Sequence, residues 1–170
     1  SHTSRSKAAE ELSNWRKELD LCYHGQPNHP LSLELQQVIR QYEIPEEYFQ
    51  ELLNGVEMDL IKNRYATFRE LSEYCFRVAS VIGLICIRIF GCDTKTVSEH
   101  AIHQGMAFQL TNILRDLGTD AGRGRIYLPL DEMARFKYSE ADLLKSTYNP
   151  AFVELMRFQA QRARKYFEKA

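Results

Sequence analysis

Two aspartates one helical turn apart, Asp116 and Asp120, are the residues whose type and spacing point most directly to chemistry. At about 100° per residue, they share one narrow arc of a predicted helix with Gly105, Gln109 and Asn112. Apolar residues flank this arc on both sides: Met106, Phe108, Ile113 and Leu117. The face of a helix that carries apolar residues is usually buried, and burying an unpaired charge is costly. We therefore expect a cation beside the two carboxylates.

Mg²⁺ is the cation that this pair favours, because it takes oxygen ligands and commonly bridges one or two carboxylates to phosphates. The neighbouring Arg115, Arg123 and Arg125 offer donors to phosphate oxygens. Gly105 lacks a side chain, so we expect it to leave room for a bulky ligand. A pair of aspartates at this spacing is a weak signal by itself. The alternative is a solvated helix end at which the arginines pair with the carboxylates.

The elements that would position these residues are all helices. No segment alternates like a strand, so the sequence predicts one all-α domain of packed antiparallel helices over residues 1–170. Thr67 to Glu70 and Thr96 to Glu99 have the pattern of capping boxes, and Asn149-Pro150 is typical of a helix start. Hydrophobic periodicity and stop signals predict helices at about Ser6–Tyr23, Leu31–Tyr42, Pro45–Leu60, Thr67–Phe90, Thr96 to Asp116 or a turn beyond, Asp131–Phe136, Ser139–Leu144 and Asn149 to the end.

Composition excludes several classes of protein. The 22 basic and 23 acidic residues give a net charge of −1, so nothing favours a nucleic-acid partner. The longest uncharged run, Val78–Ile87, is too short for a transmembrane segment. The four cysteines form no CxxC pair, which favours core packing in a reducing compartment. We expect a soluble, cytoplasmic protein, with peripheral association at the inner face of the membrane left open.

The predicted helix over 67–90 adds an apolar wall. Tyr74, Val78 and Val81 share one stripe, and ordinary core packing explains most of it. Tyr74 differs, because a buried hydroxyl needs a hydrogen-bond partner. Gly83 within this helix costs about 1 kcal/mol relative to alanine, which close packing or a cavity would justify.

Three segments carry a resemblance to a known family. Tyr74–Gly83 resembles the Tyr-Cys-x-x-Val-Ala-Gly-x-Val-Gly block of the squalene/phytoene synthases, which are head-to-head prenyl transferases. Gln109–Asp120 resembles the second aspartate-rich motif of that family, and Arg123–Pro129 (RGRIYLP) follows it as it does there. The segments around Gly55–Leu60, Arg64–Phe68 and Asn149–Arg164 look most like bacterial presqualene diphosphate synthases of hopanoid pathways.

The resemblance implies an all-α, isoprenoid-synthase-type bundle. It also implies two prenyl diphosphate substrates, such as farnesyl diphosphate, with Mg²⁺ holding the diphosphates. One substrate would ionise to an allyl cation, which the double bond of the other would attack to give a cyclopropyl intermediate. By matching position, the implied Mg²⁺ ligands are Asp116, Asp120 and Asn112. Further implied contacts are Gln109 beside the metal, Arg115 and Tyr127 on diphosphate, Tyr74 at the reacting centre, and Val78, Ile82 and Gly105 along the prenyl channel.

The chain departs from the family pattern in one respect. Family members carry a first aspartate-rich motif, and no DxxxD precedes Asp116 here. We therefore expect the chain to correspond to the central part of such an enzyme, truncated at both ends. The nearest rival within the family is a phytoene synthase using geranylgeranyl diphosphate. A non-catalytic helical module of the same fold and a terpene cyclase stay open as competing hypotheses. For Asp59, a supporting role near the cavity and a surface position remain equally open.

Overall fold

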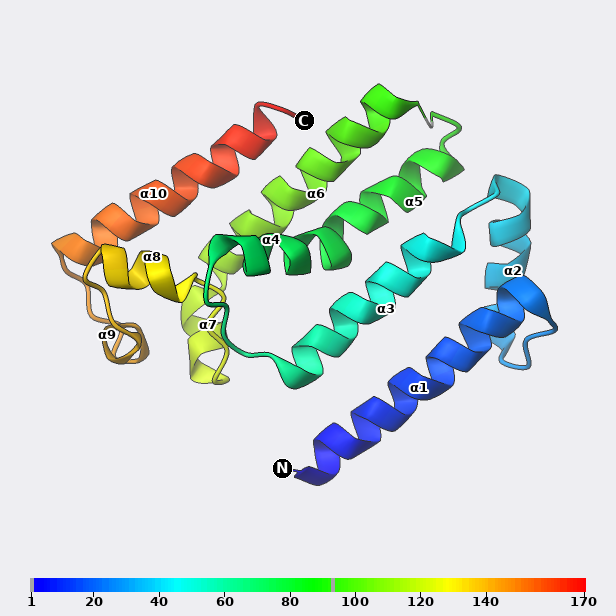
Figure 1. Cartoon of the computed structure of the whole chain (residues 1–170), viewed down its shortest axis with the longest axis horizontal. Helices are drawn as coiled ribbons and strands as arrows, with labels where there is room; N and C mark the ends of the chain where they lie inside the picture. The colour runs from blue at the N-terminus through cyan, green and yellow to red at the C-terminus, as the bar shows by residue number, and fades with distance from the viewer. Residues whose placement is uncertain (1, 93) are drawn as a thin grey trace.

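The computed structural model describes residues 2–92 and 94–170, with side chains placed from Ser6 onward, and its described part is helical (Figure 1). Within that part, the one β feature is an isolated parallel bridge between Arg64 and Ile126. The all-α fold class predicted from the sequence is confirmed. The elements are α1 (His2–His24), α2 (Pro30–Tyr42), α3 (Glu46–Ile61), α4 (Phe68–Cys75), η1 (Phe76–Ser80), α5 (Val81–Ile89), α6 (Lys95–Arg115), α7 (Leu117–Gly122), α8 (Leu130–Arg135), α9 (Glu140–Leu144) and α10 (Pro150–Phe167).

The long helices lie side by side in a single layer, in the order α1, α3, α5, α6 and α10 (Figure 1). Neighbours in this layer run in alternating directions, as Figure 1 shows, so the antiparallel packing is as predicted. The short helix α2 packs on α1, and α7 contacts α9 below the end of α6. No helix in the described part of the chain is long and apolar enough to cross a bilayer.

Capping side chains fix several helix starts. The Thr67 hydroxyl accepts a hydrogen bond from the Glu70 amide as predicted, but the Glu70 carboxylate accepts from the Ala66 amide, so only one half of the expected capping box is found. The Asn149 side chain accepts a hydrogen bond from the Phe152 amide, as predicted. The expected start at Thr96 is wrong. Thr94 caps α6 instead, because its hydroxyl accepts a hydrogen bond from the amide of Val97.

The predicted helix over 67–90 is interrupted in its middle by a π-helical turn, η1. This turn packs against α6 at Gly105, where a Cβ would lie 2.5 Å from the Ser80 Cα. The Ser80 hydroxyl also donates to the Ile102 carbonyl, at 2.8 Å. Gly105 is therefore needed for close helix packing, and the expectation that it leaves room for a ligand is wrong. Close helix packing also explains Gly83, where a Cβ would lie 3.0 Å from the Ala101 carbonyl oxygen.

Two buried clusters form the core. One joins α4, α6 and the segment after α7, and the other lies beneath α7, α8 and α9. The first cluster contains Tyr65, Leu71, Tyr74, Cys75, Met106, Leu110, Ile113, Tyr127 and Ala163. The second contains Ala121, Ile126, Leu128, Met133, Tyr138, Leu143 and Leu155. Cys22 and Cys75 are buried free thiols, whereas Cys86 is half-buried and Cys92 is exposed.

Candidate functional site

The polar stripe predicted from the sequence follows the edge of the buried face of α6. Gln109 and Asn112 are half-buried, next to the buried Met106, Leu110 and Ile113. The stripe thus adjoins the core instead of replacing it, which corrects the expectation that it lies where the buried stripe should be.

The helix breaks at Asp116, which separates α6 from α7, yet the two aspartates keep helical spacing. The Asp116 amide donates to the Asn112 carbonyl, and the Asp120 amide donates to the Asp116 carbonyl, both at 2.9 Å. The two carboxylates therefore remain one turn apart on one side of the chain, although the Asp116 side chain is 41% exposed.

The electrostatics of the two aspartates differ. Arg115 donates two hydrogen bonds to the Asp116 carboxylate, at 2.8 and 2.6 Å, and these lower the pKa of Asp116. The pKa of Asp120 is raised, first by burial and then by the charge of Asp116, with Arg123 and Arg125 opposing the shift. Ionisation of Asp120 in the folded protein is therefore unfavourable, and a bound cation would offset this cost. Both interpretations of the pair find support, because Asp116 is paired with an arginine, whereas no ion pair to Asp120 is found among the described side chains.

A second acidic centre, which the sequence left undecided, is Asp59 in the last turn of α3. Its Oδ2 accepts a hydrogen bond from the Tyr74 hydroxyl at 3.1 Å, and its Oδ1 accepts one from the Tyr127 hydroxyl at 3.0 Å. Arg125 lies 3.5 Å from Oδ1 and donates to the Asp59 carbonyl at 3.1 Å. Asp59 is therefore a hub that joins α3, α4 and the loop after α7, so the supporting role is the one that the structure favours.

Two backbone segments bring the aromatic residues to this hub. The Ile126 amide donates to the Asn63 carbonyl at 3.0 Å, and the Leu130 amide donates to the Tyr65 carbonyl at 2.9 Å. This pairing places Tyr127 against Tyr65, and the tyrosine cluster (Tyr65, Tyr74 and Tyr127) packs with ring centroids 5.3 to 5.7 Å apart. The phenols of the cluster have raised pKa values, mainly because they are buried, and the charge of Asp59 adds to the shift. The three phenols therefore stay neutral at physiological pH.

A cavity of about 270 Å³ lies between the end of α3 and the loop after α7. Its polar lining combines Asp59 with Lys62, Asn63, Arg123 and Arg125. Such a set of donors can hold an anion close to the carboxylates.

The remaining predicted residues differ in their exposure. Gly105 is buried against Ser80, and Val78 packs into the first core cluster. Ile82 is 45% exposed and faces outward. The described residues thus show Tyr74 and Tyr127 together at Asp59, and Gln109, Asn112, Asp116 and Asp120 in one stripe. The prenyl channel along Val78, Ile82 and Gly105 stays a prediction.

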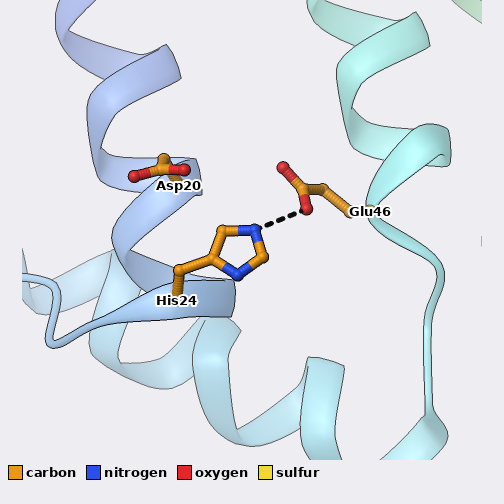
Figure 2. A group of neighbouring side chains, drawn as sticks. All are labelled: Asp20, His24 and Glu46. Carbon is orange, nitrogen blue, oxygen red and sulfur yellow. Dashed lines mark hydrogen bonds and ion pairs between the residues drawn. The ribbon is translucent and has the colours of Figure 1, made fainter.

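A separate group, Asp20, His24 and Glu46, could hold a metal ion, since one ligand atom of each lies within 4.8 Å of the others (Figure 2). Asp20 and His24 are one turn apart on α1, and Glu46 is the first residue of α3. His24 and Glu46 already form a hydrogen bond at 2.9 Å, which accounts for their proximity. His24 and Asp20 are exposed, unlike the half-buried aspartates of the stripe.

A family model described as squalene/phytoene synthase matches residues 1–170, and the chain belongs to this family. The phytoene synthase of Arthrospira platensis is 42% identical over 175 residues, covering 95% of this chain and 57% of that protein. The 15-cis-phytoene synthase of Synechocystis sp. is 40% identical, covering 95% of this chain and 51% of that protein.

Solved structures support the same family. The squalene synthase HpnC from Alicyclobacillus acidocaldarius superposes with a TM-score of 0.89 at 25% identity, covering 93% of this chain and 60% of that one. A dehydrosqualene synthase gives a TM-score of 0.86 at 30% identity, covering 97% of this chain and 59% of that one. The chain therefore spans between half and three-fifths of the length of these proteins.

Proposed function

We propose that this chain carries part of the active site of a prenyl transferase that joins two allylic prenyl diphosphates head to head. The observation that carries the proposal is the pair of carboxylates, Asp116 and Asp120, one turn apart in a chain of the squalene/phytoene synthase family. The Asp59 hub and the basic cavity beside it support the same site.

The donor set fits Mg²⁺. Asp116 and Asp120 provide carboxylate oxygens, and Asn112 provides an amide oxygen one turn earlier. The raised pKa of Asp120 reflects burial and the repulsion from Asp116 that a cation between the two would relieve. Bound Mg²⁺ would stabilise the negative charge that builds up on a leaving diphosphate.

The chain's own residues have distinct roles in the proposed reaction. Arg115, Arg123 and Arg125 would bind diphosphate oxygens, and Gln109 would line the site beside them. Tyr74 would lie next to the reacting carbon atoms as a neutral phenol whose hydroxyl donates a hydrogen bond to Asp59. Positive charge that develops on the allylic carbon would then be near an electron-rich ring.

For the substrate, we propose geranylgeranyl diphosphate, because the relatives at 42% and 40% identity are named phytoene synthases. This replaces the expectation of farnesyl diphosphate and a hopanoid pathway. Farnesyl diphosphate remains the second candidate, favoured by the fold similarity to a squalene synthase and a dehydrosqualene synthase.

Product analysis after incubation of the whole chain with each diphosphate and Mg²⁺ tests the proposal. We expect phytoene or its cyclopropyl diphosphate precursor from geranylgeranyl diphosphate. Presqualene diphosphate or squalene from farnesyl diphosphate alone would favour the second candidate. Binding of both diphosphates without any product, even after the segments that its relatives carry beyond this chain are restored, would refute the catalytic proposal in favour of a non-catalytic module.

A further inference from the structure

We infer that Asp59 is a positioning residue that acts on the proposed reaction through Tyr74. The inference rests on the proposed function, and it extends it to a residue on α3, far in sequence from the aspartate pair. Asp59 precedes Tyr74 by 15 residues and Tyr127 by 68, so only the folded chain brings them together.

The geometry shows that both oxygens of the Asp59 carboxylate are committed. Each accepts one phenolic proton, from Tyr74 at 3.1 Å and from Tyr127 at 3.0 Å. Arg125 faces the same carboxylate at 3.5 Å and compensates its charge. A carboxylate with this full set of partners fixes the orientation of both phenol groups.

The tyrosine cluster limits how far Tyr74 can move. The Tyr74 ring lies 5.5 Å from that of Tyr65 and 5.3 Å from that of Tyr127, and all three residues are less than 10% exposed. Packing alone still allows rotation of the hydroxyl proton, and the bond to Asp59 removes that freedom. Asp59 therefore decides where the Tyr74 proton points.

This orientation has a chemical consequence. A phenol that donates to a carboxylate has a more electron-rich oxygen and ring, which attract positive charge. The proton of Tyr74 is directed at Asp59, so Tyr74 would act as a neutral partner of a developing carbocation and not as an acid. No proton needs to be transferred in this role.

The experiment compares four forms of the whole chain in steady-state kinetics: wild type, Asp59→Asn, Tyr74→Phe and the double variant. Asparagine keeps the size of Asp59 and cannot accept both phenolic protons as a carboxylate does. We expect Asp59→Asn to lower kcat by about tenfold or more with KM changed by less than about twofold. Because Asp59 acts through Tyr74, the double variant should be no slower than Tyr74→Phe. The matched control is Glu57→Gln, two residues earlier on α3, where the side chain pairs with Arg16 at the surface. It should retain wild-type kcat.

The possible results are distinct. Turnover by Asp59→Asn at the wild-type rate, or losses that multiply in the double variant, would overturn the inference and leave the proposed function standing. No turnover by the wild-type chain, even with the segments that its relatives carry beyond it restored, would overturn the proposed function, and this inference with it. If Asp59→Asn does not fold, Asp59→Glu replaces it, because it keeps the charge and moves the carboxylate by one methylene. Wild-type kcat in that variant would overturn the inference.

Discussion

Replacing Gly105 by alanine tests how tightly the π-helical turn packs on α6. The new Cβ would lie 2.5 Å from the Ser80 Cα, 2.6 Å from the Ser80 nitrogen and 2.8 Å from the Ala79 carbonyl carbon. Carbon atoms pack favourably at about 3.5 to 4.0 Å, so the two helices would have to separate by about 1 Å. All three atoms are backbone, and no flexible side chain can move aside.

The magnitude follows from two opposing effects. Overpacking of a core costs about 1 to 3 kcal/mol, and backbone contacts place this site at the upper end. Alanine recovers about 1 kcal/mol of helix propensity. We therefore expect a net loss of about 2 kcal/mol, which lowers the Tm of a chain of this size by roughly 4 to 8 °C.

Thermal unfolding followed by circular dichroism measures this effect. The control is Gly118→Ala in α7, where a Cβ would meet nothing within 4 Å, so its Tm should stay unchanged or rise. A Tm for Gly105→Ala equal to or above that of Gly118→Ala would refute the packing argument.

Three further predictions concern charge, core and capping. Asp120→Asn should stabilise the protein at pH 7, because the pKa of Asp120 in the folded protein is raised above 3.8 and wild-type stability falls as the pH rises through that pKa. In urea unfolding, the variant and the wild type should be equally stable below about pH 3.8. A difference between them that persists there would count against the burial argument. Leu155 is 0% exposed, so Leu155→Ala should lower the free energy of unfolding in urea by about 3 kcal/mol. Leu144 is 55% exposed, so Leu144→Ala should change it by no more than about 0.5 kcal/mol. Equal effects of the two variants would contradict the assigned core. Asn149→Ala removes the cap of α10 and should cost about 1 kcal/mol, and an unchanged midpoint would show that the cap contributes nothing.

Local sequence signals predicted the helices well, because their causes are local. Thr67 and Asn149 cap helices through amides three residues away, so a short window of sequence contains all the information. The π-helical turn at 76–80 was missed because its cause is not local. Ser80, the last residue of the turn, packs against Gly105, which lies 25 residues later in the sequence.

The same distinction applies to the site. Asp116 and Asp120 could be found because helical spacing alone brings them together. Asp59 could not be assigned, because an isolated aspartate near a helix end is usually a surface residue, and its partners Tyr74, Arg125 and Tyr127 come from other elements. Gly105 was misread because a missing side chain gives the same signal for an open cavity as for a close backbone contact.

The central claim is that Asp116 and Asp120 act together on a diphosphate. Release of inorganic pyrophosphate from geranylgeranyl diphosphate, measured against Mg²⁺ concentration, tests it most directly. We predict Mg²⁺-dependent release by the wild-type chain and by an Asp131→Asn control in the exposed first turn of α8, and its loss in the double variant Asp116→Asn/Asp120→Asn. Equal release by the double variant and the wild type would contradict the account.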